Sequence, residues 1–236
     1  MKIFSMKKFF TLFFCLCFGI IFSQNTYFFD HSLVYDIRFD NKKIDRVYYL
    51  NSYDNNFFVE FTYYKDSTNL NFSLVDRKSE ILSKSKVNQE LFFKAEVINI
   101  DCSSLLKSSN INKYKTKEYD FVKYNDTLIN DTLYNHYAIK SNKSLKYIKR
   151  KKIGEYHYIV TKDNPKFLPF FEHPTPYEEW KEERNIPNGI MKSFYMVNSK
   201  GEITYKAELK SILKQTKKMV IPDDCTIETI MMFKIN

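Results

Sequence analysis

Glycine is scarce in this sequence, and its scarcity argues against several classes of enzyme. The 236-residue chain has four glycines, and only Gly154, Gly189 and Gly201 lie after residue 23. Phosphate-binding loops, dinucleotide-binding fingerprints and nucleophile elbows each need two or more glycines within a few residues. The sequence therefore excludes most nucleoside triphosphatases, Rossmann enzymes and α/β-hydrolases.

Histidine is equally sparse. His31, His136, His157 and His173 are scattered, with no pair at helical spacing and no Cys-x-x-Cys motif, so no sequence-local zinc site is present. His157 lies between two tyrosines in a predicted strand. It could be a base or a ligand, but a half-buried strand histidine is the plainer interpretation. We expect no catalytic set, no metal and no cofactor.

The first residues predict a secretory signal peptide over residues 1–23. Three lysines among the first eight residues precede Phe9–Phe22, an uncharged run of 14 residues, and Ser23 precedes a plausible cleavage point at Gln24. A membrane-spanning helix needs about 20 apolar residues, so a retained anchor is the less favoured alternative. We expect an exported chain, periplasmic or extracellular, with no transmembrane segment after cleavage.

Only two cysteines, Cys102 and Cys225, follow the predicted leader. In an oxidising compartment such a pair is a disulfide candidate, and two separate buried thiols are the alternative. Asp223 and Asp224 precede Cys225 and could bind a cation. An acidic turn beside a disulfide is the simpler explanation.

Basic residues exceed acidic ones, but moderately. Removing the three leader lysines lowers the formal net charge from +9 to +6, with both signs mixed along the chain, which does not indicate nucleic-acid binding. The segment Lys140–Lys152 holds seven basic residues and no acid. We predict a basic hairpin there, either a patch for lipid headgroups or acidic polysaccharide, or lysines that protect an edge strand. The candidate patch comprises Lys146, Lys149, Arg150, Lys151 and Lys152.

Apolar and polar residues alternate through most of the chain, which is typical of strands with one buried face. Strands are expected at 33–39, 44–50, 57–64, 70–74, 91–100, 190–197 and 203–213, with a three-stranded meander across 119–160. The tetrapeptide Asn-Asp-Thr-Leu occurs twice in that meander, at 125–128 and 130–133, and predicts two turns. The short polar connections favour an antiparallel sheet.

The sequence contains one clear helix start, at Thr175. Thr175 can cap the first turn, Pro176 suits the first helical position, and Tyr177 and Trp180 share a face that must dock on the sheet. The acidic residues of this helix are expected on a solvated face rather than as a catalytic pair: Glu178, Glu179, Glu182 and Glu183.

The segment Asn185–Met191, Asn-Ile-Pro-Asn-Gly-Ile-Met, resembles the Gly-Leu-Pro-Gly-Leu-Ile (GLPGLI) motif of small exported bacterial proteins, with Asn188 inserted and the leading glycine missing. The layout of leader, antiparallel meanders and one short helix also resembles periplasmic half-barrel lipoprotein-carrier proteins. This resemblance implies a fold and transfers no site.

We therefore expect one β-dominant domain over residues 24–236, a strongly curved antiparallel meander sheet, half-barrel-like, with one short helix. The first functional hypothesis is a non-enzymatic carrier of a lipid-like or amphiphilic ligand in a hollow concave face. Aromatic side chains that fill this face would favour an envelope scaffold that uses the basic hairpin. A hydrolase would require His157 or His173 to meet a carboxylate and a hydroxyl. The oligomeric state stays open.

Overall fold

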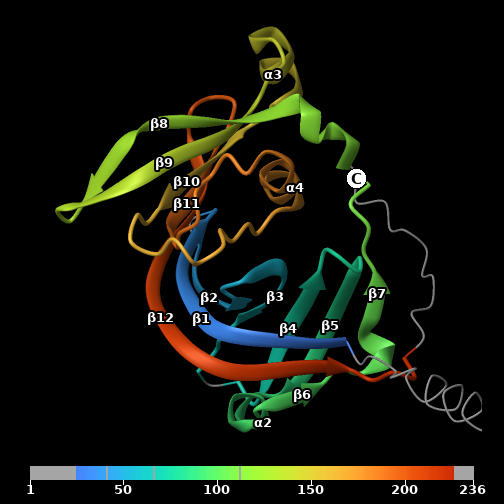
Figure 1. Ribbon diagram of the computed structural model, residues 1–236. Coiled ribbons are helices and arrows are strands. Elements are labelled where there is room, and N and C mark those ends of the chain that lie inside the picture. The colour runs from blue at the N-terminus through green and yellow to red at the C-terminus, as the bar shows by residue number, and fades with distance from the viewer. Residues whose placement is uncertain (1–24, 41, 66, 112, 226–236) are drawn as a thin grey trace, which may run out of the picture.

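The computed structural model describes residues 25–40, 42–65, 67–111 and 113–225, so the predicted leader lies outside the described residues. One open sheet has the strand order β7-β5-β4-β3-β2-β1-β12-β11-β10-β9-β8, with β6 beside β12 (Figure 1). In chain order the strands are β1 (Asn25–Phe39), β2 (Lys42–Asn51), β3 (Asp54–Thr62), β4 (Asn69–Asp76), β5 (Ile81–Asn88), β6 (Val97–Asn99), β7 (Leu105–Lys107), β8 (Tyr119–Ile129), β9 (Thr132–Ser141), β10 (Glu155–Val160), β11 (Met191–Val197) and β12 (Ile203–Ile221).

Every strand pair is antiparallel except β6 with β12. The predicted β-dominant class and the strongly curved antiparallel sheet are thus confirmed. Short polar turns allow neighbouring segments of the chain to pair directly, which is why most neighbours in the sheet are also neighbours in sequence.

Two long strands, β1 and β12, join the halves of the sheet. Residues 203–208 of β12 pair with β11, whereas residues 218–220 pair with β6. Strand β1 follows β12 along nearly its whole length, with bulges that let both strands bend. In Figure 1 the two strands curve together around the left and lower sides of the molecule.

The sheet carries a separate core on each face. Along β2, Tyr48 and Leu50 belong to one buried cluster, and Val47 and Tyr49 belong to the other. This is the alternation expected of a strand buried on both sides. The first cluster includes Tyr177 and Trp180 of helix α4 (Pro174–Glu183) on the concave side, and the second surrounds Phe92.

Three short α-helices are described instead of one: α2 (Gln89–Lys94), α3 (Leu145–Lys151) and α4 (Pro174–Glu183). Two 3₁₀ turns, η1 (Cys102–Ser104) and η2 (Lys113–Glu118), lie between β6 and β8. Helix α2 replaces the first half of the strand expected at 91–100. The side chain of Asn88 accepts a hydrogen bond from the Leu91 amide and starts the helix, which buries Phe92.

Helix α4 (Pro174–Glu183) is the predicted helix, but it begins two residues early. His173 is the N-cap without a side-chain hydrogen bond, so Thr175 is not the cap. Tyr177 and Trp180 are buried as expected. The solvated acidic face is wrong for Glu178 and Glu179, which are 7% and 5% exposed, because the 3₁₀ turn η2 and strand β8 flank this helix.

The meander also differs at one predicted turn. Asn125–Leu128 lies within β8 and forms a bulge between Tyr124 and Thr127. The chain reverses only at Asn130 and Asp131, whose φ angles of 47° and 59° suit a tight hairpin turn. The extended partner strand β9 overrides the first turn signal.

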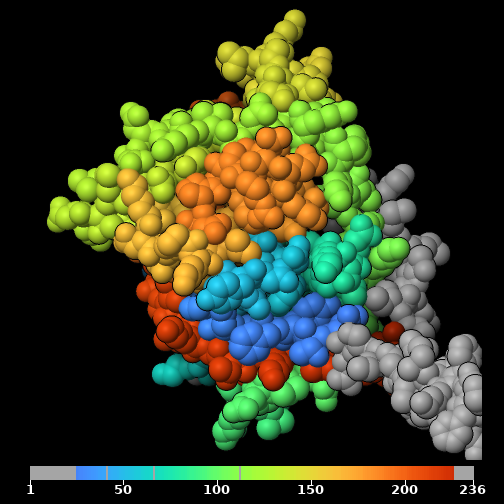
Figure 2. Space-filling model, in the orientation of Figure 1, coloured from blue at the N-terminus to red at the C-terminus, as the bar shows by residue number. Residues whose placement is uncertain are grey.

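The concave side is occupied by residues 165–173, which we call the strap, and by α4. Figure 2 shows their atoms packed directly against those of β1–β3. Phe167, Phe170 and Phe171 of the strap are buried with Trp180 in the same cluster. Within the described residues, no helix is both long and apolar enough to cross a bilayer.

Candidate functional site

Glu172 fastens the strap to the concave face. Its carboxylate accepts hydrogen bonds from Arg46 Nη1 at 2.7 Å, Tyr48 Oη at 2.8 Å and Tyr205 Oη at 2.8 Å. The Glu172 side chain is 10% exposed and that of Arg46 is 26% exposed. Burial and the charge of Glu172 raise the pKa of Tyr205, which keeps the phenol a hydrogen-bond donor.

The turn between β2 and β3 holds the other side of the strap. The Leu168 amide donates to the Ser52 carbonyl at 2.9 Å, and Asn55 Nδ2 donates to the Pro169 carbonyl at 2.8 Å. Gly189 then closes the loop after α4, donating to the Phe167 carbonyl at 2.7 Å with φ 155°. A Cβ at Gly189 would lie 2.5 Å from the Thr161 carbonyl oxygen. The concave face is therefore a packed core.

The predicted basic hairpin is a helix. After β9 the chain enters α3, where Ser144 accepts from the Tyr147 amide and Lys152 ends the helix in the left-handed conformation. Lysines on a helix cannot protect an edge strand, so that alternative is wrong for Lys146–Lys152. Figure 1 shows α3 projecting away from the body of the protein.

The structure brings the five patch residues together on this projection. All five are exposed, and none forms an ion pair with another described residue: Lys146, Lys149, Arg150, Lys151 and Lys152. Tyr147 and Ile148 of the same helix are half-buried, and Leu145 is 75% exposed. Five cations and an exposed leucine make a surface with basic and apolar character.

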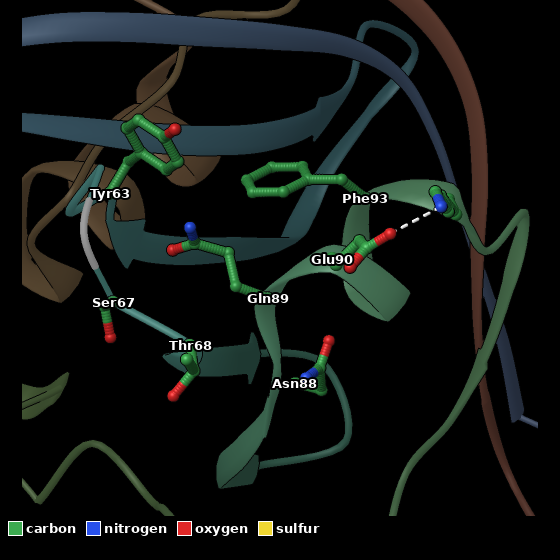
Figure 3. A pocket seen from close by; sticks show the side chains of 8 residues that line it. Tyr63, Ser67, Thr68, Asn88, Gln89, Glu90 and Phe93 are labelled. Carbon is green, nitrogen blue, oxygen red and sulfur yellow. Dashed lines mark hydrogen bonds and ion pairs between the residues drawn. The ribbon is translucent and has the colours of Figure 1, made fainter.

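A pocket of about 480 Å³ opens beside α2 (Figure 3). The rings of Tyr63 and Phe93 stand 5.8 Å apart, edge to face, and each residue is more than 40% exposed. In Figure 3 the side chain of Gln89 points toward the rings of Tyr63 and Phe93. The remaining lining residues are polar: Ser67, Thr68, Asn88, Glu90 and Lys94. An aromatic wall with hydroxyl and amide groups suits a ligand with one apolar and one polar part.

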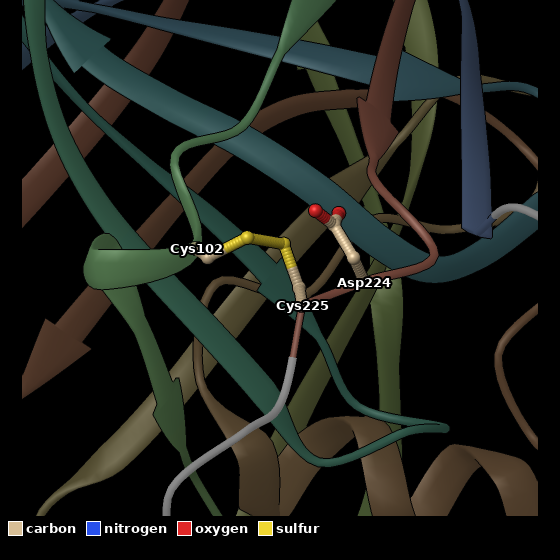
Figure 4. A group of neighbouring side chains, drawn as sticks. All are labelled: Cys102, Asp224 and Cys225. Atoms are coloured by element: carbon tan, nitrogen blue, oxygen red, sulfur yellow. A yellow bond between two sulfur atoms is a disulfide. The ribbon is translucent and has the colours of Figure 1, made fainter.

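Cys102 and Cys225 form the predicted disulfide, and Asp224 lies beside it (Figure 4). The three side chains come close enough to suggest a metal site. The sulfurs are bonded to each other, however, and a disulfide sulfur is not the thiolate that binds metals. The acidic turn beside a disulfide is thus the interpretation that fits the geometry.

Two of the four histidines meet on the face of the sheet opposite α4. His136 Nε2 lies 3.0 Å from His157 Nδ1, and the Tyr195 hydroxyl lies 3.3 Å from the same His136 nitrogen. Burial lowers the pKa of His136. Burial and the neighbouring His136 lower the pKa of His157 to about 4, so both rings are neutral at neutral pH.

The hydrolase hypothesis required a histidine to meet a carboxylate and a hydroxyl, and at His157 the carboxylate is Glu155, whose Oε2 lies 3.5 Å from His157 Nε2. The hydroxyl nearest this pair belongs to Tyr195, and burial raises its pKa, which makes it a poor nucleophile. His173 approaches Glu172 at 3.9 Å, but that carboxylate is occupied by the strap contacts. At His31 and Ser52, Asp30 lies between the imidazole and the hydroxyl and contacts both.

Sequence reasoning missed the Glu172 contacts, the α2 pocket and the histidine pair. Glu172 lies in a proline-rich segment, where no periodicity assigns a direction to its side chain. His136 and His157 are 21 residues apart, and the register of β9 against β10 brings them together. The one available signal for the pocket was Asn88 as a helix cap three residues before Leu91.

Comparisons with known proteins give remote structural similarity only. No known family and no curated protein matches the sequence. A chain of the MucA/MucB complex of Pseudomonas aeruginosa matches with 8% identity over 82% of this chain and 53% of that chain, at a TM-score of 0.42. This chain thus spans about half the length of that protein.

Two further solved structures come from the lipoprotein-sorting class that the layout resembles. A putative outer membrane lipoprotein-sorting protein domain from Vibrio parahaemolyticus is 7% identical over 79% of this chain and 85% of its own, at a TM-score of 0.30. A LolA superfamily protein from Nitrosomonas europaea is 9% identical over 80% and 86%, at a TM-score of 0.28. Likeness at this level says nothing of ligand or partner. The resemblance to GLPGLI proteins is not supported by these matches.

Proposed function

We propose that this chain is an exported, non-enzymatic binding protein that attaches to anionic lipid headgroups through α3. The observation that carries the proposal is the projecting helix with five exposed, unpaired cations and an exposed Leu145. The predicted leader and the Cys102–Cys225 disulfide support export, because structural disulfides persist in oxidising compartments.

The geometry favours a headgroup surface over a narrow anion site. Four of the cations, Lys149–Lys152, lie at consecutive positions where α3 ends, and Lys146 lies about one turn before them, so the charges are spread around one projection. A surface of many phosphates can meet several of them at once, whereas a single small anion would meet one or two. Leu145 sits at the first turn of the same helix and can enter the interface between headgroups and acyl chains.

Vesicle binding tests this proposal. Each cation near an anionic membrane contributes about 1 kcal/mol, so changing Lys146, Lys149, Arg150 and Lys151 to Gln should weaken sedimentation with phosphatidylglycerol vesicles by at least about 100-fold. Binding by the wild-type protein should fall steeply between 50 and 300 mM salt, and pure phosphatidylcholine vesicles should not bind.

A matched control removes the same charge elsewhere. Lys78, Lys84, Lys86 and Lys107 are exposed and lie on or beside β4, β5 and β7. Changing these four to Gln should leave at least half of the vesicle binding. Equal loss in both variants would show that only net charge matters, and wild-type protein that ignores anionic vesicles at low salt would end the proposal.

A second candidate function is the carriage of an amphiphilic molecule, with the α2 pocket as the site. The concave face that the carrier hypothesis first pointed to is packed with side chains, whereas Tyr63 and Phe93 stand open beside polar groups. A molecule with a short apolar chain and a hydrogen-bonding head would fit the lining.

Mass spectrometry of material extracted from the purified protein tests this carriage. The wild-type protein should release a bound amphiphile, and changing Tyr63 and Phe93 together to Ala should reduce its amount at least tenfold. Tyr53 is 71% exposed and does not line the pocket, so Tyr53→Ala is the control. An empty wild-type extract would contradict carriage.

A further inference from the structure

The face of β8–β11 that points away from α4 carries a compact cluster around two histidines. His136 is on β9 and His157 is on β10, and the strand register makes them diagonal neighbours across that pair. His136 Nε2 and His157 Nδ1 face each other at 3.0 Å. His157 is 8% exposed, and His136 is half-buried, so one side of the pair is open to solvent.

Two tyrosines fix the orientation of these rings. Tyr195, opposite His157 on β11, stacks on it with ring centroids 4.7 Å apart and an interplanar angle of 4°. Tyr124, opposite His136 on β8, stacks on it at 4.8 Å and 22°. Each imidazole is thus held by a cross-strand partner, and the two nitrogens face each other across a hydrogen bond, whose proton a metal ion would replace.

We propose that His136 Nε2 and His157 Nδ1 form a binding site for a divalent transition metal, copper(II) before nickel(II) or zinc. Two nitrogens about 2.0–2.1 Å from one metal and 3.0 Å from each other subtend an angle of about 90°. This is the angle between neighbouring ligands in a tetragonal site, and it is smaller than the tetrahedral angle that zinc prefers.

Two further groups suit such a site. The Tyr195 hydroxyl lies 3.3 Å from His136 Nε2 and offers an oxygen beside the pair. Glu155 Oε2 lies 3.5 Å from His157 Nε2, and Lys140 Nζ holds that carboxylate at 3.1 Å. A carboxylate on the second nitrogen of a ligating histidine fixes its tautomer and raises its basicity, and this arrangement recurs around protein-bound metals. Water would complete the coordination from the open side.

Copper(II) titration of the tag-free protein tests the assignment, with calorimetry for stoichiometry and electron paramagnetic resonance for the ligands. We expect one equivalent to bind and a spectrum with hyperfine coupling from two imidazole nitrogens. His136→Gln and His157→Gln should each weaken binding at least 30-fold, and the residual spectrum should show one nitrogen fewer. Zinc should bind less tightly than copper by tenfold or more.

His173→Gln is the matched control, because the side chain of His173 is 42% exposed and lies apart from the pair. This variant should bind copper as the wild type does. Selective paramagnetic broadening of the His136 and His157 ring signals in the wild-type protein gives a readout that needs no variant to fold. Copper that broadens His31 or His173 instead, or binding that survives loss of either paired histidine, would overturn the proposal.

Discussion

Glu172 contacts three side chains from two strands, β2 and β12, that are far apart in the sequence and separated in the sheet by β1. Arg46 and Tyr48 come from β2, and Tyr205 comes from β12, so one carboxylate connects the strap with both. Breaking a partly buried ion pair leaves the partner charge and two hydroxyl donors without their acceptor, which costs more than the pair contributes in isolation. Glu172 is therefore a stabilising residue rather than a reactive one.

We predict that Glu172→Gln lowers the free energy of unfolding by about 2–4 kcal/mol, because Arg46 loses the nearer of its two carboxylate partners, Glu172 at 2.7 Å and Glu60 at 3.8 Å, while the shape of the side chain is kept. Urea denaturation followed by tryptophan fluorescence measures this directly, since Trp180 lies in the same core. Glu182→Gln at the exposed end of α4 should change stability by less than about 0.5 kcal/mol. Equal effects would assign no special role to Glu172.

Asp30 supports a prediction on pH. Burial raises the pKa of this carboxyl, but hydrogen bonds from the Ser52 hydroxyl and from His31 outweigh it, so the pKa lies below the ordinary value of 3.8. The unfolded chain therefore binds a proton more readily than the folded one in acid. The contribution of Asp30 is present above about pH 4 and is lost as pH falls through its folded pKa.

The stability difference between the wild type and Asp30→Asn should thus shrink as pH falls from 5 to 2. Urea midpoints measured across that range give the slope. Asp163→Asn, at an exposed loop position, should leave the pH profile of the wild type unchanged. A difference that stays constant over this range would show that Asp30 titrates normally.

At the scale of elements, the disulfide closes the end of the sheet that hydrogen bonds leave open. Cys102 lies in η1 between β6, which pairs with β12, and β7, which pairs with β5. Cys225 follows the end of β12. The bond therefore ties the last strand of the chain to the connection between two short strands, which have only three paired residues each.

Changing both cysteines to Ser should lower the free energy of unfolding by about 2–4 kcal/mol, because the bond closes a loop of 123 residues in the unfolded chain. Hydrogen exchange should accelerate first in β6 and β7. Dithiothreitol should destabilise the wild type and leave the double variant unaffected. Alkylation of Cys102 and Cys225 without prior reduction would contradict the bridge.

The elements that could be predicted from sequence were those with strict alternation. β4 and the first half of β12 follow a period of two and lie where that period indicates. Helix α2 could not be assigned, because Leu91, Phe92 and Phe93 form an apolar run that fits strand or helix, and only tertiary packing selects Phe92 for the core. Helix α3 could not be assigned for the same reason, since Tyr147 and Ile148 fit the spacing of a strand as well as that of a helix.

The candidate sites were less predictable than the elements, for a physical reason. The exposed cations of α3 are contiguous in sequence, so composition alone found them. The histidine pair depends on register between strands, and the Glu172 contacts depend on how an irregular segment crosses the sheet. Neither is encoded in a local pattern.

At the scale of the whole molecule, the two opposed cores determine where a ligand can bind. The sheet is covered by α4 and the strap on one face and packs around α2 on the other, so aromatic residues that suggested a ligand cavity serve as packing. The surfaces that we propose for binding therefore lie on the outside: the projecting α3, the pocket beside α2 and the histidine cluster.

Trp180→Ala distinguishes a packed concave face from a hollow one. Trp180 is 2% exposed, contacts Phe171, and donates from Nε1 to the Ile186 carbonyl at 3.1 Å. Removing it from a packed core should cost about 3–5 kcal/mol, because the surrounding side chains cannot close the void. Tyr53→Ala, at a 71% exposed turn, should cost less than about 0.5 kcal/mol.

If the concave face instead held an amphiphile in the native protein, Trp180→Ala would enlarge that chamber at a cost of about 1 kcal/mol. It would also increase the amount of extracted ligand, whereas the Tyr63 and Phe93 changes would leave that amount unaltered.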